Sequence, residues 1–159
     1  MKTLILVRHA KSDWPPLTAD FDRPLESKGI DDAHKMAVFL LNEKIEIDQF
    51  ITSSALRAKT TCEIFAEKYG QNYSEKIELY HANPSQFENV ILNVDDNINT
   101  VALFSHNNGI SNFANTLCEQ NVYFKTCAVA IFKIDGESWS EFTSRKIKLT
   151  DYFTPKDVG

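Results

Sequence analysis

The sequence contains few of the residues that mark disordered, fibrous or disulfide-stabilised proteins. It has 5 Gly, 5 Pro and 3 Cys among 159 residues, against 11 Phe, and 43% of the residues are hydrophobic. This composition excludes low-complexity disorder, collagen and a long flexible linker. The length predicts a single domain over residues 1–159, which buries roughly two-thirds of its unfolded surface without a disulfide or structural metal.

Long hydrophobic runs and paired cysteines are also lacking. No run approaches the roughly 18 apolar residues that cross a bilayer, and the stretch from Leu4 to Val7 is too short for a signal peptide. Cys62, Cys118 and Cys127 are odd in number and scattered, which favours reduced thiols. We therefore expect a cytoplasmic protein that does not engage a membrane.

Acidic residues outnumber basic ones. The chain has 17 Lys and Arg against 22 Asp and Glu, a formal net charge of −5. A general nucleic-acid coat protein is expected to be basic, so the charge argues against nucleic acid as a partner. A negative net charge over the whole chain is still compatible with a locally positive pocket.

Apolar runs and helical patterns alternate along the chain. An apolar run such as 100–104 is typical of a strand buried on both faces, and Ile30, Ala33 and Ala37 share one face of a helix. Such alternation predicts an α/β fold with a mostly parallel sheet, and Asp135-Gly136 predicts a hairpin turn. The polar tail from about residue 148 is expected to fray. The expected strands are 3–7, 49–52, 77–80, 100–104, 128–134 and 139–147, and the expected helices are 27–42, 55–69, 84–93 and 110–118.

Polar side chains follow three of the expected strands. Arg8 and His9 follow the first strand, Arg57 lies just after the second, and His106 and Asn107 follow a third. Ligands of open α/β sheets bind outside the carboxyl ends of the strands, and helix N-termini there favour anions. Guanidinium groups match phosphate oxygens bidentately, so this grouping predicts a site for a phosphoryl group.

The grouping also suggests a reaction. A histidine beside arginines resists protonation, and its neutral ring nitrogen can attack phosphorus to give a phosphohistidine. The arginines and the second histidine would hold the phosphoryl oxygens as charge redistributes. This two-step transfer requires no metal and no cofactor.

Four sequence elements in this order resemble the histidine phosphatase superfamily, and within it the small SixA-type phosphohistidine phosphatases. They are Leu6 to Ser12, Arg23-Pro24-Leu25 followed by Gly29, Ser53 to Thr60, and Ser105-His106-Asn107. The resemblance covers nearly the whole chain and implies a three-layer α/β/α sandwich with a mixed, mainly parallel sheet.

The resemblance also implies roles for individual residues. His9 would accept the phosphoryl group, and Arg8, Arg57 and His106 would complete the phosphate pocket. The further oxygen contacts would come from Arg23, Ser12 and Asn107. Arg23 has a second interpretation from the residues alone, since it could instead pair with Asp20 or Asp22.

The acidic proton donor of the larger superfamily branches has no counterpart after the third expected strand, where the sequence reads Leu79 to Asn83. An alkoxide leaving group needs such a donor, whereas the imidazole of a phosphohistidine leaves more easily. We therefore expect a phosphorylated protein as partner, such as a histidine-phosphotransfer domain. Asp13 and His81 remain alternative donors, which would suit a small phosphorylated substrate.

Other chemistries are less consistent with the sequence. A cysteine phosphatase needs Arg six residues after its Cys, and none of the three cysteines has one. Asp20-Phe21-Asp22 resembles an aspartyl-phosphate box but follows Pro15-Pro16 rather than a buried strand, so it is rejected. Two alternatives stay open: a phosphatase of a small phosphate ester, and a catalytically silent module that binds a phosphorylated ligand.

Overall fold

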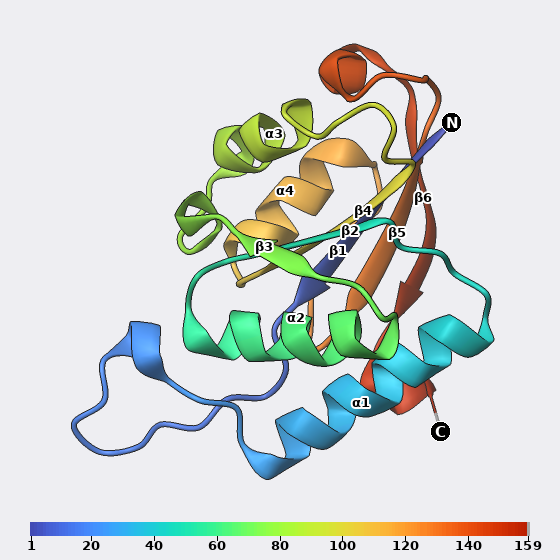
Figure 1. Cartoon of the computed structure of the whole chain (residues 1–159). Helices are drawn as coiled ribbons and strands as arrows, with labels where there is room; N and C mark the ends of the chain where they lie inside the picture. The colour runs from blue at the N-terminus through green and yellow to red at the C-terminus, as the bar shows by residue number, and fades with distance from the viewer. Residues whose placement is uncertain (159) are drawn as a thin grey trace.

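The computed structural model describes residues 1–158, which form one twisted sheet between two layers of helices (Figure 1). The strands are β1 (Lys2–Arg8), β2 (Gln49–Thr52), β3 (Tyr73–Glu75), β4 (Thr100–Ser105), β5 (Val129–Ile134) and β6 (Ile147–Phe153). The α-helices are α1 (Ser27–Asn42), α2 (Leu56–Lys68), α3 (Pro84–Leu92) and α4 (Gly109–Leu117). Short 3-10 helices are η1 (Asp20–Asp22), η2 (Ile77–Leu79), η3 (Trp139–Ser144) and η4 (Pro155–Asp157).

The sheet is mixed and mainly parallel. Its strand order is β3-β2-β4-β1-β5-β6. The pairs β1–β4, β2–β4 and β2–β3 are parallel, whereas β5 and β6 extend one edge in antiparallel pairing. The predicted fold class, a three-layer α/β/α sandwich, is confirmed.

Successive side chains of the central strand point into different layers. Leu4 and Leu6 pack with α3, α4 and η3, whereas Ile5 and Val7 pack with α1 and α2. This division follows from the alternation of side chains along a strand. Both faces of β1 are covered, and its residues from Leu4 to Val7 accordingly form a continuous apolar run. No helix of residues 1–158 is both long and apolar enough to traverse a bilayer.

One predicted strand is wrong. Residues 77–80 were expected to form a strand, but they contain η2, and the edge strand β3 lies earlier in the chain, at Tyr73–Glu75. Its three residues pair with β2 through the backbone while Ser74 and Glu75 stay exposed. A strand this short and polar has no hydrophobic pattern by which it could be found.

The second strand of the predicted hairpin is also wrong. Most of residues 139–147 forms η3, whose Trp139 and Phe142 are buried in the core beside α3. The strand that returns along β5 is β6, so residues 148–153 are paired rather than frayed. The prediction failed because β6 is an edge strand with exposed polar positions at Lys148, Thr150 and Asp151. Beyond it, η4 packs near α1, and Val158 is buried.

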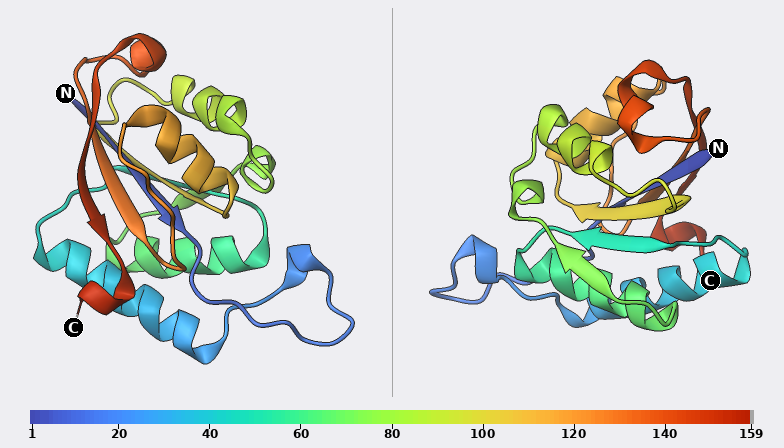
Figure 2. Two further views of the ribbon diagram at one scale, coloured as in Figure 1. Left: turned by 180° about the vertical axis from the view of Figure 1, so that it is seen from behind. Right: turned by 45° about the horizontal axis from the view of Figure 1, so that its top comes forward.

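The segment between β1 and α1 forms a lobe over the carboxyl ends of the strands, seen as the blue loop in Figures 1 and 2. We call residues 11–25 the β1–α1 lobe. It joins the body where Glu26 N donates to Lys11 O at 3.0 Å and where α1 begins. Gly29 is required at this junction, because a Cβ there would lie 2.0 Å from Lys11 O. The lobe is thereby held against the end of the sheet where the predicted site lies.

Candidate functional site

His9 lies at the end of β1, and its side chain is buried. Nδ1 is 2.7 Å from the Ala10 carbonyl oxygen, which can only accept a hydrogen bond. Nδ1 therefore carries the proton of the neutral ring, and the lone pair resides on Nε2. Burial lowers the pKa of His9 to about 3, and the positive charges of Arg57, Arg8 and Arg23 act in the same direction. His9 is thus a neutral imidazole at physiological pH with its nucleophilic nitrogen defined.

Arg57 points at that nitrogen from the first turn of α2. Its Nε lies 3.3 Å from His9 Nε2 and donates to it. The position of α2 relative to β1 is fixed by Thr61, whose hydroxyl donates to Arg57 O at 2.8 Å and accepts from Ala10 N at 3.0 Å. Thr61 is a residue that the sequence analysis missed, although it lies one helical turn after Arg57.

His106 follows β4 and faces His9, with their ring centroids 5.2 Å apart. Its Nε2 is hydrogen-bonded to the Ser53 hydroxyl at 2.8 Å, and Ser53 Oγ also accepts from Ala55 N at 3.2 Å. Burial lowers the pKa of His106 to about 2, with His9 and Arg57 acting in the same direction. Its Nδ1 is buried and has no hydrogen-bond partner within residues 1–158. The ring is therefore neutral and retains one nitrogen for a ligand.

Asp20 is the acidic residue of the site, which sequence analysis considered only as part of a rejected motif and as a partner for Arg23. Its Oδ1 accepts from Arg23 Nη1 at 3.1 Å, and its Oδ2 accepts from Arg57 Nη2 at 3.0 Å and from Tyr80 Oη at 2.6 Å. Its main-chain oxygen accepts from Arg57 Nη1 at 2.7 Å. Burial alone would raise the pKa of Asp20, but the bonds from Tyr80, Arg23 and Arg57 outweigh it and hold the pKa well below its usual range.

Arg23 and Ser12 belong to the same network. Arg23 is buried, and besides Asp20 it donates to Asp13 O at 3.0 Å and to Ser12 Oγ at 2.5 Å. The exposed ring of Trp14 covers its guanidinium, with the ring centroid 3.3 Å from Cζ. The structure shows the ion pair of Arg23 with Asp20, and a contact of Arg23 with a phosphoryl oxygen stays a prediction. Arg23 and Ser12 hold the β1–α1 lobe beside the site.

Arg8 lies at the edge of the pocket. Its Nη1 donates to Phe124 O at 2.9 Å, while its buried Nε has no partner among the described residues. Burial lowers the pKa of Arg8, and the neighbouring charge of Arg57 contributes to that shift. A half-buried cation with an unused donor is suited to an anionic ligand.

Asn107 and the two alternative proton donors lie at the periphery. The Asn107 amide bonds to Ser111 and to Asn108 at the start of α4. Asn107, His81 and His106 line a cavity of about 290 Å³, and the His81 ring stacks on Tyr80 with centroids 3.9 Å apart. The exposed Asp13 carboxylate instead accepts from Trp14 N at 2.8 Å. Neither donor candidate is hydrogen-bonded to His9.

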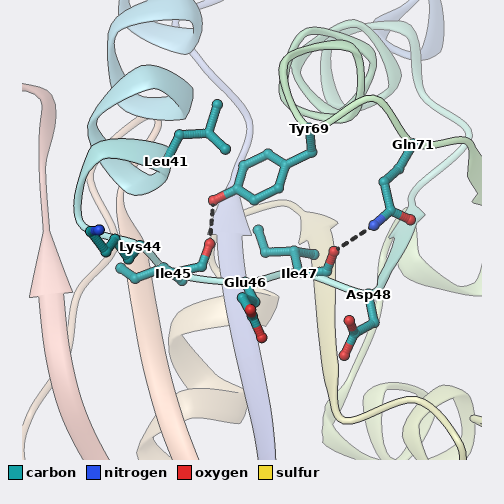
Figure 3. Close-up of a pocket in the computed structure, with 8 residues that line it drawn as sticks. All are labelled: Leu41, Lys44, Ile45, Glu46, Ile47, Asp48, Tyr69 and Gln71. Carbon is teal, nitrogen blue, oxygen red and sulfur yellow. Dashed lines mark hydrogen bonds between the residues drawn. The ribbon is translucent and has the colours of Figure 1, made fainter.

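A larger hollow of about 550 Å³ lies at the other end of the sheet, beside the loop that precedes β2 (Figure 3). Two of its polar side chains bond to the backbone of that loop: Tyr69 Oη donates to Ile45 O at 2.7 Å and Gln71 Nε2 donates to Ile47 O at 3.0 Å. It holds none of the histidines or arginines described above. We therefore place the functional site at His9 rather than in this larger hollow.

The fold and this site together describe an α/β protein in which two neutral histidines lie beside charged arginines, the grouping expected of a phosphate site. A family model described as "Histidine phosphatase superfamily (branch 1)" matches residues 4–91, which is more than half of the chain. The chain belongs to this superfamily.

Individual relatives are similar to larger or smaller parts of the chain. An uncharacterized protein of Mycobacterium tuberculosis (strain ATCC 25618 / H37Rv) is 27% identical over 94% of this chain and 100% of its own. A 2,3-bisphosphoglycerate-dependent phosphoglycerate mutase of Rhizobium meliloti is 34% identical, over 59% of this chain and 46% of its own.

Solved structures share the fold. The protein histidine phosphatase SixA complexed with tungstate has a TM-score of 0.85 at 21% identity and covers 98% of both chains. The mycobacterial glucosyl-3-phosphoglycerate phosphatase complexed with VO3 has a TM-score of 0.76 at 14% identity, over 97% of this chain and 100% of that chain.

Proposed function

We propose that this protein is a phosphatase that works through a phosphohistidine at His9. The observation that carries the proposal is the defined lone pair on His9 Nε2, with the Arg57 guanidinium 3.3 Å away. The lone pair forms the new bond to phosphorus, and the leaving group departs with the electron pair of the bond that breaks. Water then attacks the phosphohistidine, the phosphorus–nitrogen bond breaks, and phosphate leaves with His9 again neutral.

The surrounding groups support both steps. Phosphorylation of Nε2 places a positive charge on a ring whose Nδ1 proton is already bonded to Ala10 O, so the carbonyl stabilises the intermediate. Arg57 Nε faces the position of a phosphoryl oxygen, and the unpartnered Nδ1 of His106 can donate to a second oxygen when it carries the ring proton. The half-buried Arg8 adds a further cation.

We propose protein phosphohistidine as the substrate. Asp20 is the carboxylate bonded to the site arginines, and its depressed pKa makes it a poor proton donor at neutral pH. The site therefore lacks, within the described residues, a carboxylic acid poised to protonate an alkoxide. A phosphoramidate needs less help, because its imidazole leaving group can carry a proton on its other nitrogen. The shared fold with the protein histidine phosphatase SixA is consistent with this substrate.

The proposal is tested by measuring phosphate release without added metal. A histidine-phosphotransfer domain phosphorylated on its histidine is compared with a panel of small phosphate esters. We expect turnover of the phosphoprotein, and we expect His9→Ala to abolish it while circular dichroism shows the fold retained. Preference for an ester, without action on the phosphoprotein, would overturn the substrate. Full activity of His9→Ala would overturn the mechanism.

A small phosphate ester is the second candidate substrate. The 290 Å³ cavity beside His106 includes His81, an imidazole that could supply a proton to an alkoxide. If an ester is the substrate, His81→Ala should lower its turnover by about 100-fold or more, within the usual range for a general acid. The same change should leave phosphohistidine hydrolysis nearly unaltered.

A further inference from the structure

The Asp20 contacts use both terminal nitrogens of Arg57. Nη1 donates to the main-chain oxygen of Asp20 at 2.7 Å, and Nη2 donates to its carboxylate at 3.0 Å. A guanidinium is planar, so fixing its two terminal nitrogens also fixes the direction of the Nε–H bond. That bond points at His9 Nε2 at 3.3 Å. One lobe residue thus sets the direction of the donor that faces the nucleophile.

Two further residues hold the Asp20 side chain in place. Arg23 within the lobe donates to Oδ1 at 3.1 Å, and Tyr80 after η2 donates to Oδ2 at 2.6 Å. Phe21, the next residue of η1, packs edge-on against the Tyr80 ring with centroids 5.0 Å apart. The carboxylate therefore connects the β1–α1 lobe, the segment after η2 and the first turn of α2.

We propose that Asp20 is a positioning residue, which rests on the proposed phosphatase function of His9. It holds Arg57 so that Nε–H donates to a phosphoryl oxygen formed on His9 Nε2, and Tyr80 and Arg23 keep its carboxylate in place. Asp20 itself does not touch the reacting atoms. Its charge also offsets part of the positive charge of Arg23 and Arg57.

The same contacts are also those of a second role for Asp20, in which it competes with phosphate. A carboxylate between Arg23 and Arg57 could act as an internal anion that occupies phosphate-binding donors until substrate displaces it. Removal of a positioning group lowers kcat because Arg57 is no longer directed at the reaction. Removal of a competing anion instead strengthens binding of phosphate and lowers KM.

The steady-state test compares Asp20→Ala and Asp20→Asn with Asp22→Asn. Asp22 is the matched control, because it lies in the same short helix but is exposed and has no side-chain contact with either arginine. We expect Asp20→Ala to lower kcat by about 10- to 100-fold, the scale of a small misplacement of a catalytic group. KM should change by less than about threefold, Asp20→Asn should fall between the wild type and Asp20→Ala, and Asp22→Asn should behave as wild type.

A second variant protects the test against misfolding of the lobe. Tyr80→Phe keeps the ring that packs on Phe21 and removes only the hydroxyl that donates to Asp20. We expect a kcat loss of about fivefold, which corresponds to roughly one net hydrogen bond. Unchanged kcat in both Asp20→Ala and Tyr80→Phe would contradict the proposal.

Two measurements on the free protein separate this proposal from the phosphatase function. In nitrogen-15 NMR of the histidine rings, Asp20→Ala should shift the His9 Nε2 resonance as the Arg57 bond is lost, whereas Asp22→Asn should not. An unshifted resonance would overturn the positioning role even if the enzyme is active. Orthovanadate binding should be unchanged or weaker in Asp20→Ala, and binding that becomes tenfold tighter would establish the competing-anion role instead.

Discussion

Arg57 Nε donates to His9 Nε2 at 3.3 Å, so the cation faces the nucleophilic nitrogen rather than the outer edge of the ring. The contact joins the first turn of α2 to the end of β1, two segments 48 residues apart in the sequence. In the proposed reaction, it places a positive charge where negative charge would develop during phosphoryl transfer.

Replacement of Arg57 should therefore affect turnover strongly even when the charge is kept. Arg57→Lys cannot reach His9 and both Asp20 acceptors at once, because an ammonium lacks the planar fork. We expect kcat to fall by about 100- to 1,000-fold, as for loss of one oxyanion donor. Arg145→Lys, at an exposed ion pair with Glu141, is the control and should retain full activity. An Arg57→Lys enzyme with wild-type turnover would show that Arg57 contributes only charge.

Stability should decrease as the pH falls from 7.5 to 5.0, because His9 and His106 are buried and neutral. Their folded pKa values are about 3 and about 2, below the ordinary value of 6.5. At pH values between the folded pKa and 6.5, the unfolded chain binds more protons at these two histidines than the folded protein does. The free energy of unfolding therefore decreases as the pH falls below about 6.5. Each histidine should contribute about 2 kcal/mol of loss at pH 5.

Urea denaturation at the two pH values measures this loss. The double variant His9→Asn/His106→Asn has no imidazole at either position, so its stability should vary less over the same range. An equal pH dependence in wild type and double variant would show that other groups are responsible.

Ser53 should matter for both stability and activity through His106. Ser53→Ala removes the hydrogen bond to His106 Nε2 and the acceptor for Ala55 N. We expect a loss of about 1–3 kcal/mol in the free energy of unfolding, because a buried imidazole nitrogen is left without a partner. Turnover should fall as the His106 ring loses its fixed orientation. Ser54→Ala, the neighbouring and less buried serine, is the control for chemical denaturation and kinetics.

Thr61 should stabilise the junction between α2 and β1. Thr61→Val keeps the shape of the side chain but removes the acceptor for Ala10 N and the donor to Arg57 O. The expected cost is about 1–3 kcal/mol, mainly from the buried Ala10 N–H left unpaired. Thermal denaturation measures this loss of stability. Thr60→Val, one residue earlier and only partly buried, should lower the free energy of unfolding by less than half as much. Equal costs for the two variants would contradict this assignment.

Gly29→Ala should displace the β1–α1 lobe from the site. The added Cβ would lie 2.0 Å from the Lys11 carbonyl oxygen, a backbone atom that cannot move without the chain. We expect lower stability together with loss of turnover, since Asp20 and Arg23 are carried by the lobe. Ser27→Ala, exposed at the start of the same helix, should leave both properties intact. Limited proteolysis should cut the Gly29→Ala lobe faster than the wild-type lobe.

The parts of this protein that could be predicted are those in which burial leaves a sequence pattern. The central strands and the helices were predicted closely, because β1 and β4 are buried on both faces and α1 has one apolar face. The edge strands β3 and β6 were missed, because backbone pairing defines them and their side chains are largely polar.

The site shows the same division. His9, Arg57 and His106 could be brought together from the order of strands, because parallel strands end at one edge of the sheet. Asp20 and Tyr80 could not, because they come from irregular segments whose paths have no periodicity. Arg23 was left with two interpretations because sequence distance alone cannot separate a neighbouring carboxylate from a bound phosphate.

The direction of β1 affects how the protein can be handled in binding experiments. The strand runs from Lys2 at the far end of the sheet to Arg8 beside the site, so the amino terminus lies about 26 Å from His9 by the rise of an extended strand. A tether at Met1 would hold the protein on a sensor surface with its pocket facing the solution. A phosphorylated protein as large as this one could then reach His9 without meeting the support.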